Sequence, residues 1–341
     1  MIKTYGTNDI NWDKTIESFP IHMQDVYFTS DYYKIQEVNG DGKGVLFVYK
    51  EDEKLACYPF LVNEIKGYDL KETYFDIETA YGYGGPIVNC FDEDFLNRFE
   101  ENFCDYCIKE KIVAEFIRFN PLIGNQKIFN KNIDILHNRT TVYLDLNKSI
   151  DYIWKNQISS KNRNMIRKAE KSGLTIEYTE DLVNFRRIYE ETMDKVNATD
   201  YYYFSDEYYY YLEKLNNTYI NVKLEDEVIA TAIFMKYGEY FHYHLAGSRK
   251  EFLKFSPNNL LLWEAIKYAN SNHYKIMHFG GGLTDSPEDN LFKFKKNFSK
   301  DFCEFFIGKR VHNKEVYNKL IKMWSERNNN ESPKLLLQYR I

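Results

Sequence analysis

Hydrophobic and polar positions alternate along two segments in the pattern of a β-hairpin. Segment 44–62 reads GVLFVYK-EDE-KLACYPFLV, and segment 219–236 reads YINVKL-EDE-VIATAIFMK. In each, a polar Glu-Asp-Glu tip separates two runs rich in β-branched and aromatic residues, which predicts two antiparallel strands and a tight turn. The hairpins lie about 170 residues apart, so the pattern indicates an internal repeat.

The same elements are expected after each hairpin, in the same order. They are a third strand, a helix and a short apolar strand, at 73–77, 94–111 and 113–119 in the first copy and at 240–246, 258–271 and 275–279 in the second. A helix that joins two strands of one sheet requires them to run parallel. The sequence therefore predicts a mixed α/β (α+β) protein with two domains, 1–147 and 148–341, each with a mixed central sheet.

Further helices and a strand are expected outside the repeated part. They are a helix over 149–172 that ends at Gly173, two helices within 181–216 separated by the aromatic run 200–204, a helix over 288–298, a strand over 302–308 and a helix over 312–328. No low-complexity linker separates the halves, which predicts that they pack tightly.

Composition excludes several classes of protein. The 341 residues carry a net charge of −6, which excludes a globally basic nucleic-acid coat. No apolar run approaches the roughly 20 residues that a membrane span needs, and the first residues lack a signal-peptide pattern. Five cysteines, an odd number in a long chain, disfavour a disulfide framework. We expect a soluble cytoplasmic protein with no transmembrane segment.

A cluster of basic residues lies on the helix expected before Gly173. Six Lys or Arg and one Glu occur between Lys155 and Gly173, a local charge of +5 in an acidic chain. At 100° per residue one face of this helix carries five basic residues: Lys161, Arg163, Arg167, Lys168 and Lys171. Such a face can bind phosphates, since Arg offers them a bidentate fork. An ordinary solvated helix face would show the same pattern.

A glycine-rich turn joins an apolar strand to the late helix. The segment 278–300 reads HFGGGLTDSPEDNLFKFKKNFSK. Three glycines allow close backbone approach, and the amides that open the following helix can meet an anion. The spacing matches neither a Walker loop nor GxGxxG, so a tight strand-to-helix turn stays open as the alternative. Within the helix Phe294 precedes Lys295, whose burial would perturb its charge.

Other local features carry weaker signals. The turn AYGYGGP at 80–86 is typical of a rigid aromatic turn or of the lip of a binding groove. Cys104 and Cys107 have no partner CxxC, which favours core packing over zinc. His242 and His244 alternate on an expected strand and therefore share a face, but no third or fourth ligand has suitable spacing, so we expect no metal.

Six of these segments together resemble one bacterial family. They are AYGYGGP, RFNPLIGN (118–125), RTTVYLDL (139–146), SSKNRNMIRKAEKSGL, HLAGSRKEF…SPNNLLLWEAI and HFGGG…DNLFKFKKNFS. In this order they are similar to the tandem-GNAT acyltransferases that include the FemABX peptidoglycan aminoacyltransferases. The resemblance implies two GNAT-like domains with a groove at their junction, and it allows the last helix to pack back on the first domain.

The resemblance also implies an activity, which is acyl or aminoacyl transfer to an amine of a cell-envelope precursor. The implied donor is aminoacyl-tRNA or acyl-CoA, with no bound cofactor, and the acceptor is a nucleotide-sugar, lipid-linked or polysaccharide precursor. Lys295 matches the family's cationic residue beside the acyl-transfer centre, and Phe294 accompanies it. The expected substrate-binding residues lie in or near the matching segments: Tyr81, Tyr83, Arg118, Lys161, Arg163, Arg167, Tyr243, Arg249 and Asn258.

One difference between this sequence and the family leaves two alternative functions to consider. The acetyl-CoA loop of ordinary GNAT enzymes is missing, and Gly247 to Asn258 occupies its place, which counts against a standard CoA site. The alternatives are an acyl-CoA-dependent N-acyltransferase for an amino sugar of a surface polysaccharide, and a non-catalytic binder of nucleotide-sugar or tRNA. The general base is open between the substrate itself and an acidic side chain such as Asp76 or Asp289. Peripheral contact with a membrane is left open.

Overall fold

The computed structural model describes residues 1–129, 131, 133–179, 182–195, 197, 199 and 203–340. The chain forms two compact units. The first contains Met1–Met23, Tyr27–Asn138 and the segment that begins at Phe305. The second contains Gln24–Val26 and Arg139–Glu304.

The first unit is a mixed sheet with helices. Its elements are β1 (Ile2–Gly6), α1 (Asn11–Glu17), α2 (Ser30–Val38), β2 (Lys43–Glu51), β3 (Lys54–Glu64), β4 (Phe75–Glu78), β5 (Ile87–Val88), α3 (Glu93–Lys109), β6 (Ile112–Arg118), the end of β13 (Asp301–Val311) and α10 (Lys314–Arg327). Short 3-10 helices lie at Ile21–Met23, Val26–Phe28, Asn125–Lys127 and Gln338–Arg340. The strand order is β1-β2-β3-β4-β6-β13, and β5 pairs with β3.

The second unit repeats this plan. Its elements are the end of β7 (Asp134–Asp145), α4 (Ile150–Tyr152), a π-helix (Ile153–Gln157), α5 (Ser160–Lys171), β8 (Leu174–Thr179), α6 (Val183–Lys195), α7 (Asp206–Lys214), β9 (Asn217–Leu224), β10 (Glu227–Tyr237), β11 (Tyr240–Ser248), a 3-10 helix (Lys250–Phe255), α8 (Pro257–Ser271), β12 (Ile276–Gly280) and α9 (Asn290–Lys296). The strand order is β7-β12-β11-β10-β9-β8.

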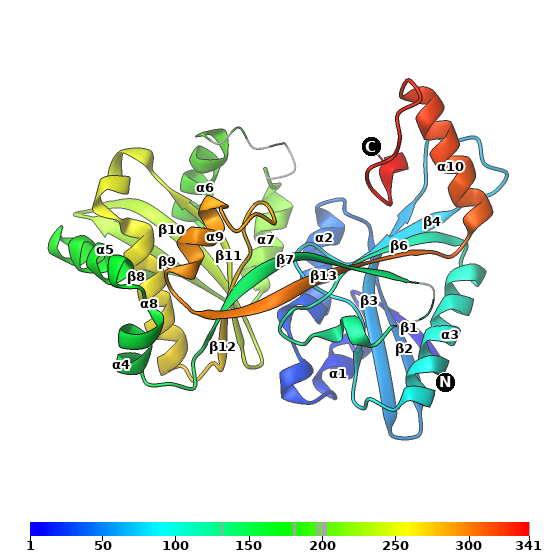
Figure 1. Ribbon diagram of the computed structural model, residues 1–341, viewed down its shortest axis with the longest axis horizontal. Helices are drawn as coiled ribbons and strands as arrows, with labels where there is room; N and C mark the ends of the chain where they lie inside the picture. The colour runs from blue at the N-terminus through cyan, green and yellow to red at the C-terminus, as the bar shows by residue number, and fades with distance from the viewer. Residues whose placement is uncertain are drawn as a thin grey trace. The chain divides into compact units, whose positions relative to one another are not determined.

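Strand pairing follows the same sequence of directions in both units. Counted inward from β1 and from β8, three antiparallel pairs are followed by one parallel pair and one antiparallel pair. The parallel pairs are β4–β6 and β11–β12, which the crossover helices α3 and α8 join (Figure 1). The predicted mixed sheets and parallel crossovers are confirmed. The repeat is longer than predicted, because it begins with β1–α1–α2 in the first unit and β8–α6–α7 in the second.

Helix α3 shows how the sequence builds the first core. Asp92 starts the helix, because its side chain accepts a hydrogen bond of 2.8 Å from the Phe95 amide. Phe95, Phe99, Phe103 and Cys107 then recur every fourth residue, so they form one stripe that is buried against β2, β3 and β6. Cys107 is thus a core residue.

The second core lies on one face of its sheet. Helices α5 and α8 and strands β9 to β12 contribute its buried side chains, among them Ile166, Leu260 and Phe234. Helix α6 packs on β10 and β11. Its own buried residues Phe185 and Ile188 lie outside that core, so α6 covers the other face.

Two strands pair outside the repeat that precedes them in the chain. β7 follows β6 but its end pairs with β12, while β13 follows β12 but its end pairs with β6. The expected boundary at residue 147 therefore differs from the observed division between residues 138 and 139. The expected second domain spans 148–341, whereas the second compact unit ends at Glu304. Helix α10 packs on β6 through Leu320 and Trp324, within the first unit.

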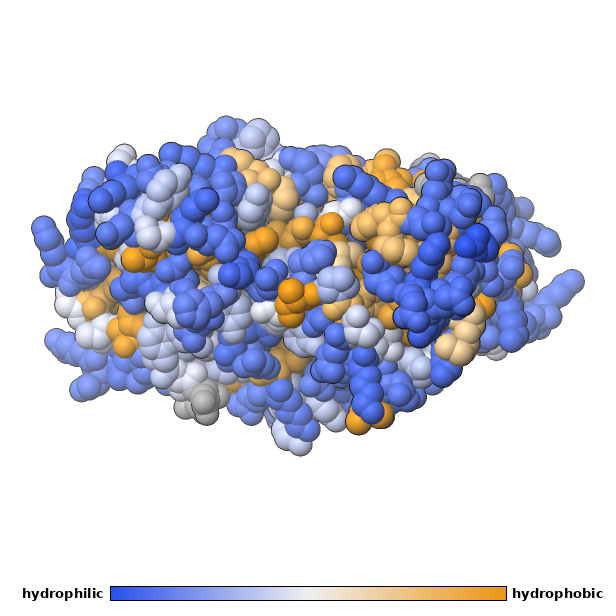
Figure 2. Space-filling model, turned by 90° about the horizontal axis from the view of Figure 1, so that it is seen from below, coloured by the Kyte–Doolittle hydropathy of each residue, from blue (hydrophilic) through white to orange (hydrophobic). Residues whose placement is uncertain are grey.

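Two expected elements differ in detail. The helix expected over 149–172 is divided into α4, the π-helix and α5, and Gly173 follows with φ of +76°. The aromatic run 200–204 lies partly outside the described residues. No helix among the described residues is long and apolar enough to cross a bilayer. Hydrophilic side chains cover most of the face shown in Figure 2, with apolar ones between them.

Candidate functional site

The parallel pairing of β11 with β12 stops inside the second unit. Its last pair is His242 with His278, after which β12 pairs only with β7, through Gly280 and Val142. Strand β11 continues to Ser248 along β10 alone. Within the described part of the chain, the backbone of β11 beyond His242 therefore has no strand on the β12 side, and a ligand can approach it there.

The glycine-rich turn closes this end of β12. Gly280 has φ of +77°, which favours glycine. A Cβ atom on Gly282 would lie 2.4 Å from Asp289 Oδ1, so a side chain there would force Asp289 to move. Arg139 Nη1 donates a hydrogen bond of 2.7 Å to the Gly282 carbonyl.

Asp289 is the anion at the start of α9. Its carboxylate accepts hydrogen bonds from the amides of Phe292, Leu283 and Thr284 at 2.9 to 3.1 Å. These bonds lower its pKa, because they favour the charged form. The amides that were expected to meet a foreign anion are thus taken by the chain's own carboxylate, and Asp289 is a cap and not a free base.

Lys295 is a buried cation that reaches the same turn. It is 8% exposed, and its Nζ donates a hydrogen bond of 2.7 Å to the Gly281 carbonyl. The Nζ atom lies 5.8 Å from the centroid of the Tyr243 ring. Burial lowers the pKa of Lys295 to about 7, with Asp289 opposing that shift and Arg139 adding to it.

The neighbours of Lys295 differ from it in exposure. Phe294 is half-buried against the second core and lies edge-on to Phe298 at 5.4 Å. Lys293 and Lys296 are exposed, and Lys293 contacts Glu288. Only Lys295 of these three lysines is therefore placed at the turn.

A pocket of about 320 Å³ lies beside α9. Its lining residues come from α5, α8 and α9 and combine two lysines, four asparagines and two apolar side chains: Lys161, Asn162, Met165, Asn259, Asn290, Lys293, Phe294 and Asn297. Lys161 and Phe294 of the expected site residues share this pocket. Asn258 does not line it, and its side chain donates to Ser248 Oγ at 3.1 Å.

The arginines of the second unit have partners of their own. Arg163 Nη1 donates to the carbonyls of Trp154 and Ile158, at 3.2 and 2.5 Å, and so closes the end of the π-helix. The exposed Arg167 lies over the Trp154 ring at 5.4 Å. Arg249 binds the carboxylates of Glu191 and Glu227. None of the three lines the pocket, and two matched carboxylates leave Arg249 poorly suited to an anionic ligand.

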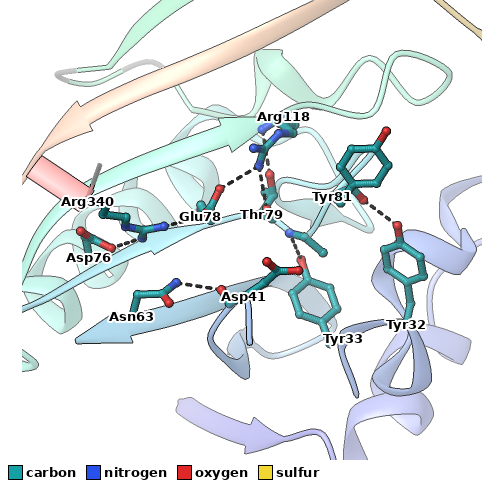
Figure 3. A network of polar contacts seen from close by, with 11 residues as sticks. Tyr32, Tyr33, Asp41, Asn63, Asp76, Glu78, Thr79, Tyr81, Arg118 and Arg340 are labelled. Atoms are coloured by element: carbon teal, nitrogen blue, oxygen red, sulfur yellow. Dashed lines mark hydrogen bonds and ion pairs between the residues drawn. The ribbon is translucent and has the colours of Figure 1, made fainter. Parts of the chain in front are cut away.

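Arg118 and Tyr81, two of the expected residues of the first unit, belong to a polar network at the end of β4 (Figure 3). Arg118 Nη1 donates to Glu78 and to the Thr79 carbonyl, both at 3.0 Å. Tyr81 is 40% exposed, and its carbonyl accepts a bond of 2.7 Å from the Tyr32 hydroxyl.

Asp76 is part of the same network, while Tyr83 makes aromatic contacts. Asp76 forms an ion pair with Arg340, which also contacts Glu78, and burial raises the pKa of Asp76. The Tyr83 ring packs edge-on against Tyr27 and Phe305. A cleft shared by Tyr81, Tyr83 and the three arginines stays a prediction, since they belong to different units.

Sequence reasoning missed a chain of buried polar groups beneath the site. His242 Nε2 lies 2.8 Å from Asp25 Oδ1, and both side chains are almost fully buried. The His242 ring lies edge-on to His278 at 5.7 Å, and His278 Nε2 lies 3.0 Å from Thr141 Oγ1. Asp25 lies far away in the sequence, so only the alternation of His242 and His244 could have pointed to this cluster.

Comparisons with known proteins relate this chain to characterised families. Residues 159–295 match the family described as Acetyltransferase (GNAT) domain. Over 280 residues the chain is 24% identical to UDP-N-acetylmuramoylpentapeptide-lysine N(6)-alanyltransferase of Weissella viridescens, covering 74% of this chain and 82% of the relative.

Two solved structures share the fold. The crystal structure of FemX matches with a TM-score of 0.71 at 17% identity, over 93% of this chain and 99% of FemX. The structure of L-PGS from Bacillus licheniformis matches with a TM-score of 0.60 at 14% identity, over 89% of this chain and 92% of that one. Together, the GNAT domain match over residues 159–295, the alanyltransferase relative and these shared folds show a chain that contains a GNAT acyltransferase domain and is similar to the FemABX enzymes.

Proposed function

We propose that the protein transfers an aminoacyl group from aminoacyl-tRNA to an amine of a peptidoglycan precursor. The observation that carries this proposal is the buried Lys295 ammonium, held by the Gly281 carbonyl where β11 and β12 cease to pair. The Weissella viridescens relative, whose name states alanyl transfer to a pentapeptide lysine, supports the class of acceptor.

Lys295 supplies the charge that this reaction requires. When an amine attacks an ester, negative charge develops on the carbonyl oxygen and then on the leaving oxygen. A preorganised cation in a buried site stabilises that charge more than it stabilises the neutral ester, which accelerates the reaction. In this account the carbonyl or leaving oxygen replaces the Gly281 carbonyl as the partner of Lys295.

The pocket beside α9 suits the nucleotide end of the donor. Lys161 offers positive charge, the asparagines offer carboxamides, and Phe294 and Met165 offer an apolar surface for a base, while the charge of Lys293 is matched by Glu288. Lys161 lies in the first turn of α5 and Asn259 in the first turn of α8, so the pocket lies beside the N-terminal turns of two helices. Binding carried by phosphate contacts should weaken as salt rises.

One reaction set tests the proposal. The protein is incubated with a lysine-containing UDP-MurNAc-pentapeptide and either a mixture of aminoacyl-tRNAs or acetyl-CoA, and products are identified by mass spectrometry. We expect one aminoacyl residue on the precursor with tRNA donors and none with acetyl-CoA. Transfer from acetyl-CoA alone would establish the acyl-CoA alternative, and tight binding without transfer from either donor would establish a non-catalytic binder.

A further inference from the structure

His244 occupies an irregular position in β11. Across the β10–β11 ladder, Ile233 pairs with Leu245 and Phe234 pairs with Tyr243, which leaves His244 without an opposite residue. His244 is thus the extra residue of a β-bulge. Bulges are common beside active sites, because they redirect a side chain away from the regular alternation.

The bulge lies next to the candidate reaction centre. The β11–β12 pairing ends at His242, two residues before His244. The preceding residue, Tyr243, presents its ring to Lys295 Nζ at 5.8 Å. His244 therefore belongs to the stretch of β11 that a ligand at the Lys295 turn would meet.

One nitrogen of His244 lacks a partner. Among the residues that the structure describes, no group hydrogen-bonds the Nε2 atom, which is sealed from solvent. The whole residue is only half-buried, so Nδ1 keeps contact with the surface. The Nε2 atoms of His242 and His278, in contrast, lie against Asp25 and Thr141. A buried polar atom without a partner is costly, which indicates a place for a ligand group.

The ring is neutral in the free protein. Burial, and then the neighbouring His242, lower the pKa of His244 to about 3. The imidazole therefore has a lone pair available to accept a hydrogen bond at any pH near neutrality.

We propose that His244 is a catalytic residue that accepts a proton from the attacking amine through Nε2. The inference rests on the proposed acyl transfer. As the neutral amine nitrogen bonds to the acyl carbon, the ester C–O bond breaks and one amine proton passes to Nε2. The ring then releases the Nδ1 proton to solvent, and the leaving oxygen takes up one proton from solvent. Because His244 is a weak base, transfer accompanies C–N bond formation, which acidifies the nitrogen.

Two substitutions and a matched control test this role by activity. His244→Phe keeps the ring but removes both nitrogens, and kcat should fall by about 10²–10⁴ with little change in KM, the usual range for a lost acid–base group. His244→Gln keeps an oxygen that can accept a hydrogen bond, so its KM should match wild type while its kcat falls. The control is His273→Asn, an exposed histidine of the same unit at φ of +63°, where asparagine is tolerated. A His244→Phe enzyme within a few-fold of the wild-type kcat overturns the proposal.

A spectroscopic test separates this proposal from the proposed function. In protein labelled with 15N-histidine, the lysine-containing pentapeptide precursor should shift the His244 Nε2 resonance, whereas the same precursor with norleucine in place of lysine should not. If the wild-type protein transfers no acyl group from either donor, the proposed function fails, and the shift of the His244 Nε2 resonance alone then decides whether His244 contacts the lysine amine. No shift with the lysine precursor, or an equal shift with the norleucine precursor, overturns the role of His244.

Discussion

The surroundings of Lys295 change the ionisation of its side chain. An exposed lysine is a solvated charge, but Lys295 is 8% exposed and donates to the Gly281 carbonyl. Desolvation brings its pKa to about 7, so its two protonation states are close in free energy near neutral pH. Lys293 and Lys296 keep their exposed positions on the same helix, which makes them natural controls.

The first prediction concerns the charge of Lys295. Lys295→Met keeps the aliphatic stem and removes the ammonium, so single-turnover transfer should fall by about 10²–10³, the usual cost of one lost oxyanion donor. The protein should remain folded by circular dichroism. Lys293→Met and Lys296→Met should react near the wild-type rate. Equal damage from Lys293→Met would show that the reaction depends on general positive charge.

The second prediction concerns pH and stability. The folded-state pKa of Lys295, about 7, lies below its ordinary value of 10.5, so the unfolded chain binds more protons between these values. The cost of burying the ammonium is present below pH 7 and is relieved as pH rises. Urea unfolding should therefore show Lys295→Met to be more stable than wild type at pH 6, with the difference shrinking by pH 9. A constant difference would contradict the buried charge.

At the scale of elements, the hairpins show what a sequence match can and cannot fix. Both turns have two-residue loops whose first residue has positive φ, Asp52 at +49° and Glu225 at +55°. The loop residues are 52–53 in the first hairpin and 225–226 in the second. The Glu-Asp-Glu sequence at 51–53 therefore starts one residue before its loop, whereas the one at 225–227 starts at the first loop residue. The two hairpins share their turn geometry, but the identical residues do not occupy equivalent positions in the two turns.

The third prediction concerns the glycine turn before α9. In Gly282→Ala the new Cβ would clash with Asp289, which caps α9 and binds the turn amides. Displacing that carboxylate should move Lys295, so transfer should fall several-fold at least while the protein stays folded. Gly6→Ala is the control, because a Cβ on Gly6 meets nothing within 4 Å. Equal activity of the two variants would mean that the turn does not position Lys295.

The fourth prediction concerns a buried ion cluster in the first unit. Arg310 on β13 lies 2.7 Å from Glu100 on α3 and 3.6 Å from Glu115 on β6, and all three side chains are about 1% exposed or less. Arg310→Met would leave two buried carboxylates without this cation and should destabilise the protein by about 3–5 kcal/mol in urea unfolding. Arg98→Met removes an exposed ion pair with Glu51 and should change the urea midpoint little. Similar midpoints for the two variants would show that the buried cluster is not needed for stability.

At the scale of the whole molecule, the two repeats exchange their following strands. The strand after β6 completes the sheet of the second unit, and the strand after β12 completes the sheet of the first. The buried pairing of Arg310 with Glu115 fixes the second of these exchanges chemically. Each unit therefore depends on a segment from the other half of the chain.

The fifth prediction follows from this exchange. A chain that ends at Glu304 lacks the part of β13 that pairs with β6, together with Arg310 and α10. Strand β6 would become an open edge, so its amides should exchange hydrogen much faster than in the full chain. Amides of β12, which keep β7 and β11 as partners, should retain their protection. Undiminished protection of β6 would show that the first unit does not need the exchanged strand.

The sequence by itself determined the elements whose patterns are local. The alternation of apolar and polar residues predicts the two hairpins, and the four-residue spacing of apolar residues predicts α3. The order of the elements predicts the parallel crossovers. All three patterns depend on residues that are near one another along the chain. Resemblance to a family, together with the Phe294–Lys295 pair, placed the candidate reaction centre on the late helix.

The tertiary structure decided which charges are free and which strands meet. Lys295 and Arg249 are both cations in the printed sequence, yet one is buried against a carbonyl and the other is neutralised by Glu191 and Glu227. Asp25 meets His242 across more than two hundred residues, and His244 leaves the regular alternation only because β10 and β11 slip by one position there. Ion pairs, desolvation and strand register depend on contacts between distant segments, and no local pattern in the sequence specifies them.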